Sequence, residues 1–397
     1  MRPLRPVKQG RELRPTRQPA AVTPYLQNLA RLAELRNQPP VKTPTLPFPH
    51  AAEAKYRRKL TDIADASFRL VQPVIDELWR LQRLAEAEQA RADADEEGEG
   101  LTPPEPEAAV RLAQRGAERQ AERRAAKQNR PHTPEEKAQL TLPVDLRDTL
   151  IAAQRRLDLF ADGLPAGLPD VIARDIERHA VRANLRVFES LGVNPIEPGS
   201  ALDRARDQWI EDNAALISSQ PTEVAERIGR IVREMVPAGA RWETIARRLE
   251  DEHGIAQRRA ALIARDQVGK YNGDCNRLQQ RAAGFTHYEW IGVMDNRERP
   301  THVALQHSIW SWESPPPIGH PGEPIQCRCS AVPVTSAQDI AKTSDWDAQE
   351  LAERTAELGP TQRQGEGATE EEVRKRAEAE VASEVRLAGR RAQVTAR

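Results

Sequence analysis

The sequence is poor in the residues on which several protein classes depend. Aromatic residues make up only 4% of the 397 residues, and only three cysteines occur. A secreted scaffold held together by disulfides is therefore disfavoured, and reduced thiols are the expected state. No apolar run approaches the ~20 residues of a transmembrane helix, and the first residues lack the apolar core of a signal peptide. We therefore expect no contact with a membrane.

Charge is abundant but balanced. Lys and Arg number 59 against 60 Asp and Glu, which argues against a globally basic nucleic-acid coat. Hydrophobic residues reach 39%, which is enough for helical bundles but too little to bury the whole length. The composition predicts a mainly α fold with a helical-bundle core and disordered arms.

The N-terminal third alternates between solvated segments and one apolar helix. Residues 1–50 are rich in proline and arginine and are predicted to form an extended arm. Residues 51–92 carry apolar side chains at three- and four-residue steps, which predicts an amphipathic helix, bent or broken at Pro73. Residues 93–141 begin as an acidic linker and continue, over 108–130, as a predicted solvated charged helix.

Apolar residues become denser in the second part of the chain. We interpret residues 142–219 as a helical region, 220–335 as a separate domain and 336–397 as a charged helical tail. Glycine and proline breaks delimit the following predicted helices: 144–161, 168–190, 201–217, 222–236, 241–253 and 256–283. Residues 243–268 look like a DNA-reading helix-turn-helix, but the first helix is too long, so two packed bundle helices are predicted.

Local signals mark helix starts and a core face. N-cap side chains are predicted at Asp170, Ser200 and Thr222, and Thr369 with Glu372 forms a capping box before the last helix. One apolar face is assigned to the core by its helical spacing: Ile228, Ile231, Val232, Met235, Ile245 and Leu249.

The periodicity changes after the last of these helices. Residues 285–293 and 327–334 are rich in aromatic or β-branched side chains, and each is predicted to be a strand. Pro333 indicates that the second strand lies at an edge. The predicted fold class is therefore a mainly α helical bundle with a small C-terminal module that contains a β-hairpin.

The segment between the two strands carries a candidate metal site. Cys327 and Cys329 are two residues apart, so on a strand both side chains point to one face. His302 and His320 would close over that face. Two thiols and two imidazoles match a tetrahedral zinc set, so these four residues are candidate ligands and zinc is the one cofactor that the sequence indicates.

Two other interpretations of this segment stay open. In the first, it is a hydrogen-bonded hairpin without metal, in which Asp295 pairs with one of three arginines: Arg297, Arg299 or Arg328. In the second, it belongs to a zinc-dependent or thiol enzyme, in which Cys327 with His320 or His302, and Asp295 as orienting group, form a nucleophilic triad. No glycine-rich elbow or phosphate loop accompanies these residues, so we do not expect an enzyme.

Motifs across residues 220–335 occur in an order that resembles a known family. A helix carries ALIARDQVGKYN, then GFTHYEWIGVMDNRERPTHVAL follows, then HPGEPIQCRC. This order resembles the phage Mu F-like minor head protein family, also called the head morphogenesis family. The positions that match its pattern are Ile263, Ala264, Arg265, Trp290, Asp295, Arg297, His302, His320, Pro321, Cys327, Arg328 and Cys329.

The chain departs from that family pattern at three places. Asp266 and Gln267 stand where Thr and Glu are usual, and His307 stands where Gly is common. Residues 322–326 are additional to the final segment.

The resemblance implies a structural, low-copy minor capsid protein of a tailed phage or prophage. It implies action near the portal during procapsid assembly, with portal, major capsid or scaffold protein as partners. The implied locations are the virion and, during assembly, the host cytoplasm. Basic side chains in 1–20 and 110–130 add non-specific DNA as an expected contact.

Overall fold

The computed structural model describes residues 22–97, 142–358 and 369–395. They divide into two compact units. The bundle unit comprises, of the described residues, 50–97, 142–174 and 207–268. The sheet unit comprises 22–49, 175–206, 269–358 and 369–395. Three predicted segments lie wholly or partly outside the described residues: the charged helix over 108–130, most of the acidic linker, and residues 1–21 of the arm.

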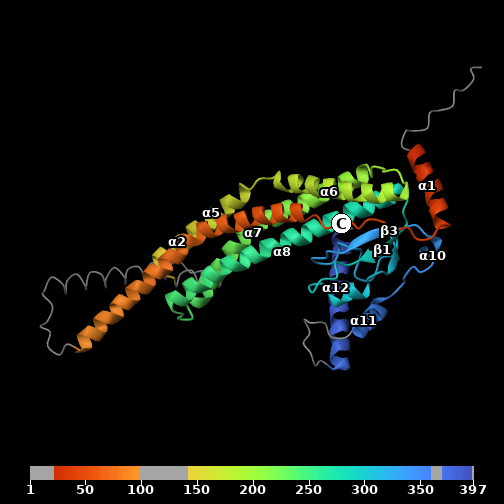
Figure 1. Ribbon diagram of the computed structural model, residues 1–397. Helices are drawn as coiled ribbons and strands as arrows, with labels where there is room; N and C mark the ends of the chain where they lie inside the picture. Colours follow the sequence, from red (N-terminus) through yellow and green to blue (C-terminus); the bar gives the residue numbers. More distant parts are fainter. Residues whose placement is uncertain (1–21, 98–141, 359–368, 396–397) are drawn as a thin grey trace, which may run out of the picture. The chain divides into compact units, whose positions relative to one another are not determined.

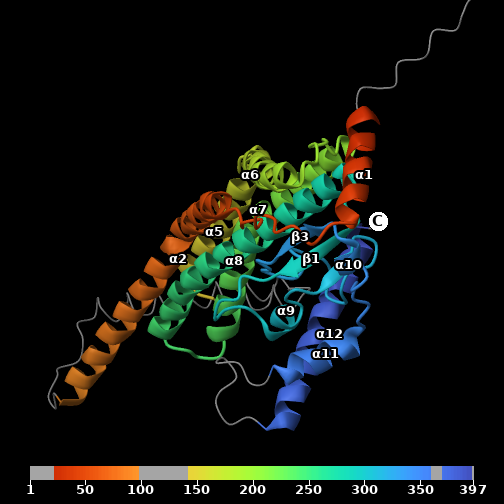
Figure 2. The ribbon, with the colours of Figure 1, turned by 45° about the vertical axis from the view of Figure 1, so that its right-hand side comes forward.

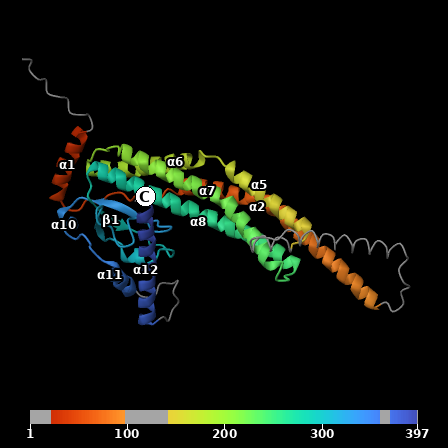
Figure 3. The same ribbon diagram turned by 180° about the vertical axis from the view of Figure 1, so that it is seen from behind.

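Long helices build the bundle unit and extend along one another (Figures 1 and 3). They are α2 (His50–Glu97), α5 (Val144–Asp162) and parts of three further helices: α6 (Leu168–Leu191), α7 (Ser200–Met235) and α8 (Trp242–Ala283). Of these three, the bundle unit contains α6 up to residue 174, α7 from residue 207 and α8 up to residue 268. The apolar spacing over 51–92 therefore predicted α2 correctly, and α2 packs extensively on α5.

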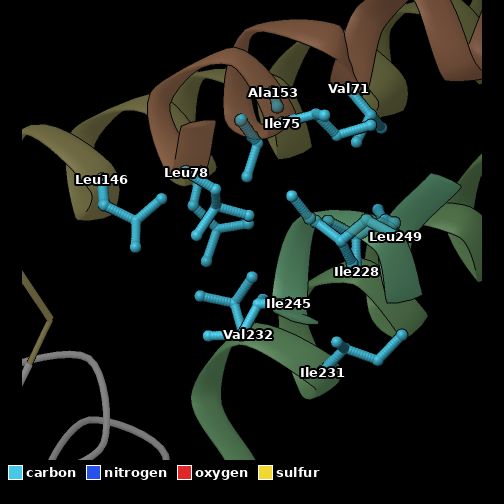
Figure 4. Close-up of a cluster of buried hydrophobic side chains, with 14 of the residues drawn as sticks. Val71, Ile75, Leu78, Leu146, Ala153, Ile228, Ile231, Val232, Ile245 and Leu249 are labelled. Atoms are coloured by element: carbon cyan, nitrogen blue, oxygen red, sulfur yellow. The ribbon is translucent and has the colours of Figure 1, made fainter. Parts of the chain in front are cut away.

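An apolar core joins these helices. Figure 4 shows the side chains converging, with Leu78 of α2 and Leu146 of α5 on one side and Ile228 of α7 on the other. The predicted core face is confirmed, because its members are buried, with Met235 partly buried against them: Ile228, Ile231, Val232, Ile245 and Leu249.

Three of these helices continue through residues that predicted an end or a bend. α2 passes through Pro73 and α7 through Pro221, so the predicted separate helices 201–217 and 222–236 are one helix. α8 likewise passes through Gly254, and residues 243–268 form neither a helix-turn-helix nor two helices. An interior proline costs a helix ~3 kcal/mol and a glycine ~1 kcal/mol. The apolar side chains buried on both sides of each position offset that cost.

Because the helices continue, two of the predicted N-caps are wrong. Thr222 lies inside α7, and Asp170 lies inside the first turn of α6, where it pairs with Arg174. α7 begins at Ser200 itself, one residue earlier than predicted.

A three-stranded antiparallel sheet forms the centre of the sheet unit, with strand order β2-β1-β3. Its strands are β1 (His287–Ile291), β2 (Ile309–Ser311) and β3 (Ser330–Val334). The two predicted strands therefore exist in shorter form and pair with each other. β3 lies at an edge, as Pro333 indicated, whereas the third strand β2 was not predicted.

Helices cover this sheet and include one in the predicted arm. α9 (Pro300–Ala304) and α11 (Ala348–Glu357) both pack on α12 (Glu370–Thr395), which Figure 2 shows beside α11. α10 (Ala337–Ile340) follows β3. α1 (Val22–Arg36) corrects the extended arm predicted over 1–50, because its Leu32 and Leu35 enter a core with Phe188 and Phe285.

The capping box before α12 is confirmed. The backbone N–H of Thr369 donates to Glu372 at 2.9 Å, and that of Glu372 donates to the Thr369 hydroxyl at 3.3 Å. The predicted tail helix also buries Val373 and Val381. The fold is thus mainly α with a small sheet, and no helix in the described ranges is long and apolar enough to cross a membrane.

Candidate metal centre

Three of the four predicted metal ligands come together inside the sheet unit. His302 lies on α9, which Pro300 starts, and Cys327 and Cys329 directly precede β3. The Nδ1 atom of His302 is 3.3 Å from the Sγ atom of Cys329 and 3.8 Å from that of Cys327. The three ligand atoms all lie within 4.8 Å of one another. His302 is only 1% exposed, Cys327 2% and Cys329 8%, so the cluster is closed to solvent.

His320, the fourth predicted ligand, has different neighbours. Its Nδ1 atom is hydrogen-bonded to the Tyr288 hydroxyl at 2.9 Å, and its ring packs on Tyr288 and Trp312. Burial, with the positive charges of Arg277 and Arg281, lowers the pKa of His320 to about 3. His320 is therefore a neutral ring that is hydrogen-bonded to Tyr288 among aromatic side chains, and the structure does not bring it into the group of three.

Glu298 takes a place beside the group of three that the sequence analysis missed. Its Oε1 atom is 3.2 Å from the Cys329 sulfur and 3.4 Å from His302 Nδ1. Its Oε2 atom accepts the backbone N–H of Val293 at 3.2 Å, and its side chain is 4% exposed. Glu298 lies four residues before His302 but in the segment that precedes α9, which begins at Pro300. No regular helical pattern therefore marked it in the sequence.

A second carboxylate reaches His302 from α12. The Oε2 atom of Glu384 is 3.5 Å from His302 Nε2, and its Oε1 atom is 2.8 Å from an amino nitrogen of Arg299. Among the described residues, neither His302 Nε2 nor Glu384 Oε2 has a hydrogen-bond partner. No sequence signal could have found Glu384, because its segment carries only a generic helical pattern.

Charges within the cluster shift the pKa values of its members. Burial favours a neutral His302, but Cys327, Glu298 and Glu384 outweigh burial and hold its pKa well above the usual value. Burial also opposes ionisation of Cys327, yet the Cys329 thiol and His302 bring its pKa well below the usual value. Burial and the neighbouring Cys327 raise the pKa of Cys329. The buried imidazole and the two sulfurs therefore influence one another's ionisation strongly.

The hydrogen-bonded arrangement of Asp295 is present next to this cluster. Arg328 donates two hydrogen bonds to the Asp295 carboxylate, at 2.7 and 2.6 Å, and Arg297 lies 3.3 Å away. The Arg328 guanidinium is the main reason that the pKa of Asp295 is lowered. Arg299 pairs with Glu384 instead. The hydrogen-bonded hairpin and the metal site are thus compatible interpretations, because they use different side chains.

Two other motif residues occupy well-defined positions. Trp290 is completely buried in β1 and its ring stands edge-on to that of His302, with centroids 5.6 Å apart and an interplanar angle of 82°. Trp290 therefore forms part of the buried surface against which the imidazole packs. Arg265 belongs to the bundle unit, where its Nε atom is 3.7 Å from Glu53.

Two places where the chain departs from the family pattern have a structural basis. His307 has a φ of 65°, a backbone conformation that favours glycine, and its side chain contacts Glu289 at 2.7 Å. Within the additional residues 322–326, Gly322 has a φ of 96° and its N–H donates to the Cys327 sulfur at 3.4 Å. A Cβ atom at Gly322 would lie 2.8 Å from the Gly269 carbonyl oxygen. The additional turn therefore supports the sulfur rather than displacing it.

Comparisons with known proteins agree with the motif order. The family model described as Phage Mu protein F like protein matches residues 226–332. An uncharacterized protein of Haemophilus influenzae is 28% identical over 134 residues, which is 33% of this chain. The matched part spans only 30% of that relative. No solved structure matches. Over residues 226–332, which include the whole β-sheet apart from the end of β3 and all three clustered ligands, the chain is similar to the phage Mu F-like family, as its motifs predicted.

Proposed function

We propose that this chain is a minor head protein of a tailed phage or prophage, with a structural role in head morphogenesis. The observation that carries the proposal is the family match over residues 226–332. As its site of action we propose the neighbourhood of the portal during procapsid assembly. The proposed partners are the portal, major capsid or scaffold protein, and the proposed locations are the virion and the host cytoplasm during assembly.

The burial of the His/Cys cluster supports a structural role over an enzymatic one. A catalytic thiol must be reached by its substrate, whereas Cys327 is 2% exposed and is covered by His302. Closed ligand sets are typical of structural sites, while catalytic metal sites keep one position open. We therefore do not propose the zinc-dependent or thiol enzyme.

Co-sedimentation with head components tests this function. The purified chain is mixed separately with portal rings, with capsid shells and with scaffold protein from the same phage, and each mixture is run on a density gradient. We expect the chain to move into the fractions of at least one component, with portal rings as the leading candidate. An unrelated helical protein of similar size provides the control.

The exposed variant Leu159→Ala is a matched positive control, because Leu159 is 72% exposed and lies outside the matched segment. It should sediment like the wild type. A chain that stays at the top of every gradient, together with normal head yield after deletion of its gene, would overturn the proposal.

A further inference from the structure

We propose that Glu298, His302, Cys327 and Cys329 bind one zinc ion in a closed structural site, and that Glu384 positions His302 from α12. This inference is independent of the proposed head function, because it rests only on side chains within the sheet unit.

The distances between the donor atoms suit tetrahedral zinc. With Zn–S at about 2.3 Å and Zn–N or Zn–O at about 2.1 Å, tetrahedral angles place sulfur about 3.6 Å from nitrogen or oxygen, and nitrogen about 3.4 Å from oxygen. His302 Nδ1 lies 3.3 and 3.8 Å from the two sulfurs and 3.4 Å from Glu298 Oε1. Glu298 Oε1 lies 3.2 Å from the Cys329 sulfur. These two distances make Glu298 the candidate for the fourth ligand.

The chemistry of the donors selects zinc among common divalent cations. Two thiolates with an imidazole are soft and borderline ligands, which suit zinc and not magnesium or calcium. Two thiolates and one carboxylate would place three negative charges in a buried site, and burying uncompensated charge is costly. A divalent cation leaves one net negative charge, and Arg328 lies 3.8 Å from Glu298 Oε2.

Surrounding groups are arranged to hold these ligands in place. The N–H group of Gly322 donates to the Cys327 sulfur, and the N–H group of Val293 donates to Glu298 Oε2. When a metal binds His302 at Nδ1, the ring proton is on Nε2, which faces Glu384 at 3.5 Å. His302 Nε2 and Glu384 Oε2 are among the buried atoms that have no hydrogen-bond partner in the described structure, and they then form a hydrogen bond with each other. α12 is thereby tied to the site.

Metal content of the full chain provides the first test. The protein is purified under reducing conditions with zinc present, dialysed, and assayed by elemental mass spectrometry. We expect about one zinc per chain. Cobalt substitution should give the strong visible absorption of tetrahedral coordination and thiolate-to-cobalt bands in the near ultraviolet. The variants Cys327→Ser, Cys329→Ser and His302→Gln should bind no stoichiometric zinc.

Two variants serve as matched controls because they change the same residue types outside the group. His320→Gln and Cys275→Ser should retain one zinc, since His320 bonds to Tyr288 and Cys275 is not among the three clustered residues. Loss of zinc in His320→Gln to the same extent as in His302→Gln would overturn the ligand set.

The role of Glu384 is separated from a merely structural one by comparing two readouts. Loss of a side chain that accepts a hydrogen bond from a metal-binding histidine weakens metal affinity by about 10- to 100-fold. We expect Glu384→Gln to lower the zinc affinity, measured by chelator competition, by that factor. Because the substitution also breaks the ion pair with Arg299, the melting temperature of the metal-free protein should fall as well, and the zinc affinity is the deciding readout. A lower metal-free melting temperature with unchanged affinity would overturn the positioning role.

A measurement on the wild type keeps the proposal testable where a variant does not fold. Alkylation of each cysteine is followed by peptide mass spectrometry with and without a chelator. Chelation should speed alkylation of Cys327 and Cys329 relative to Cys275. Absence of zinc in the wild type with equal alkylation in both conditions, or a disulfide between Cys327 and Cys329, would overturn the proposal.

Discussion

His320 should remain neutral in the folded protein until the pH approaches 3. Its ring is buried against Tyr288 and Trp312, and burial is the main cause that lowers its pKa to about 3. In the unfolded chain a histidine has a pKa of about 6.5. Because the folded-state pKa is the lower one, the stabilisation is complete above pH 6.5 and is lost as the pH falls towards 3.

The size of this effect follows from the two pKa values. Between them, one extra proton binds on unfolding, so the free energy of unfolding falls by about 1.4 kcal/mol per pH unit. At pH 4.5, two units below the unfolded value, the loss from His320 is about 3 kcal/mol. His320→Gln removes this contribution, so the variant should lose about 3 kcal/mol less than the wild type between pH 7 and pH 4.5.

Histidine NMR provides the assay, with His320→Gln used to assign the resonance. The His320 signal should keep the shifts of a neutral ring at pH 4.5. Tyr288→Phe should leave that behaviour intact, because burial and not the hydroxyl is the main cause. A midpoint near 6.5 in the wild type, or equal acid sensitivity of wild type and His320→Gln, would refute the reasoning.

Two further predictions concern the bundle core and the charged arms. Ile228→Ala should destabilise the chain by about 2–5 kcal/mol in urea unfolding, because Ile228 is 1% exposed, whereas Leu159→Ala should be nearly neutral. If both cost the same, the core assignment is wrong. Random duplex DNA should bind through 1–20 and 110–130, with an affinity that falls by a logarithmic slope of about −0.9 per neutralised phosphate as salt rises. Gel shifts that show no binding at low salt, or unchanged binding after removal of both segments, would contradict this.

The pattern of apolar residues predicted which segments are helices but not where they end. The apolar face from Ile228 to Leu249 identified the core, because helical spacing repeats locally. Pro221 and Gly254 predicted helix ends that do not occur, because their local cost can be estimated from the sequence while the packing that offsets it cannot. α1 was not predicted, because the neighbouring prolines indicated an extended chain. Its short apolar face is stabilised by packing on residues distant in the sequence.

The candidate site was predictable in part. The motif order and the two-residue spacing of the cysteines identified His302, Cys327 and Cys329. His320 was chosen because it lies near the cysteines in sequence, yet Tyr288 engages its ring nitrogen. Glu384 reaches the site only through the packing of α12 on α9, which depends on tertiary contacts that a single sequence does not encode in any local pattern.

Quantitative mass spectrometry of purified heads tests the central claim most directly. Procapsids and filled heads are isolated from the producing strain, and peptides of this chain are measured relative to the major capsid protein and to whole-cell lysate. The head-protein account predicts that the chain is enriched in heads at a few copies per major capsid shell. A chain that is present in the lysate but absent from both procapsids and filled heads would contradict it.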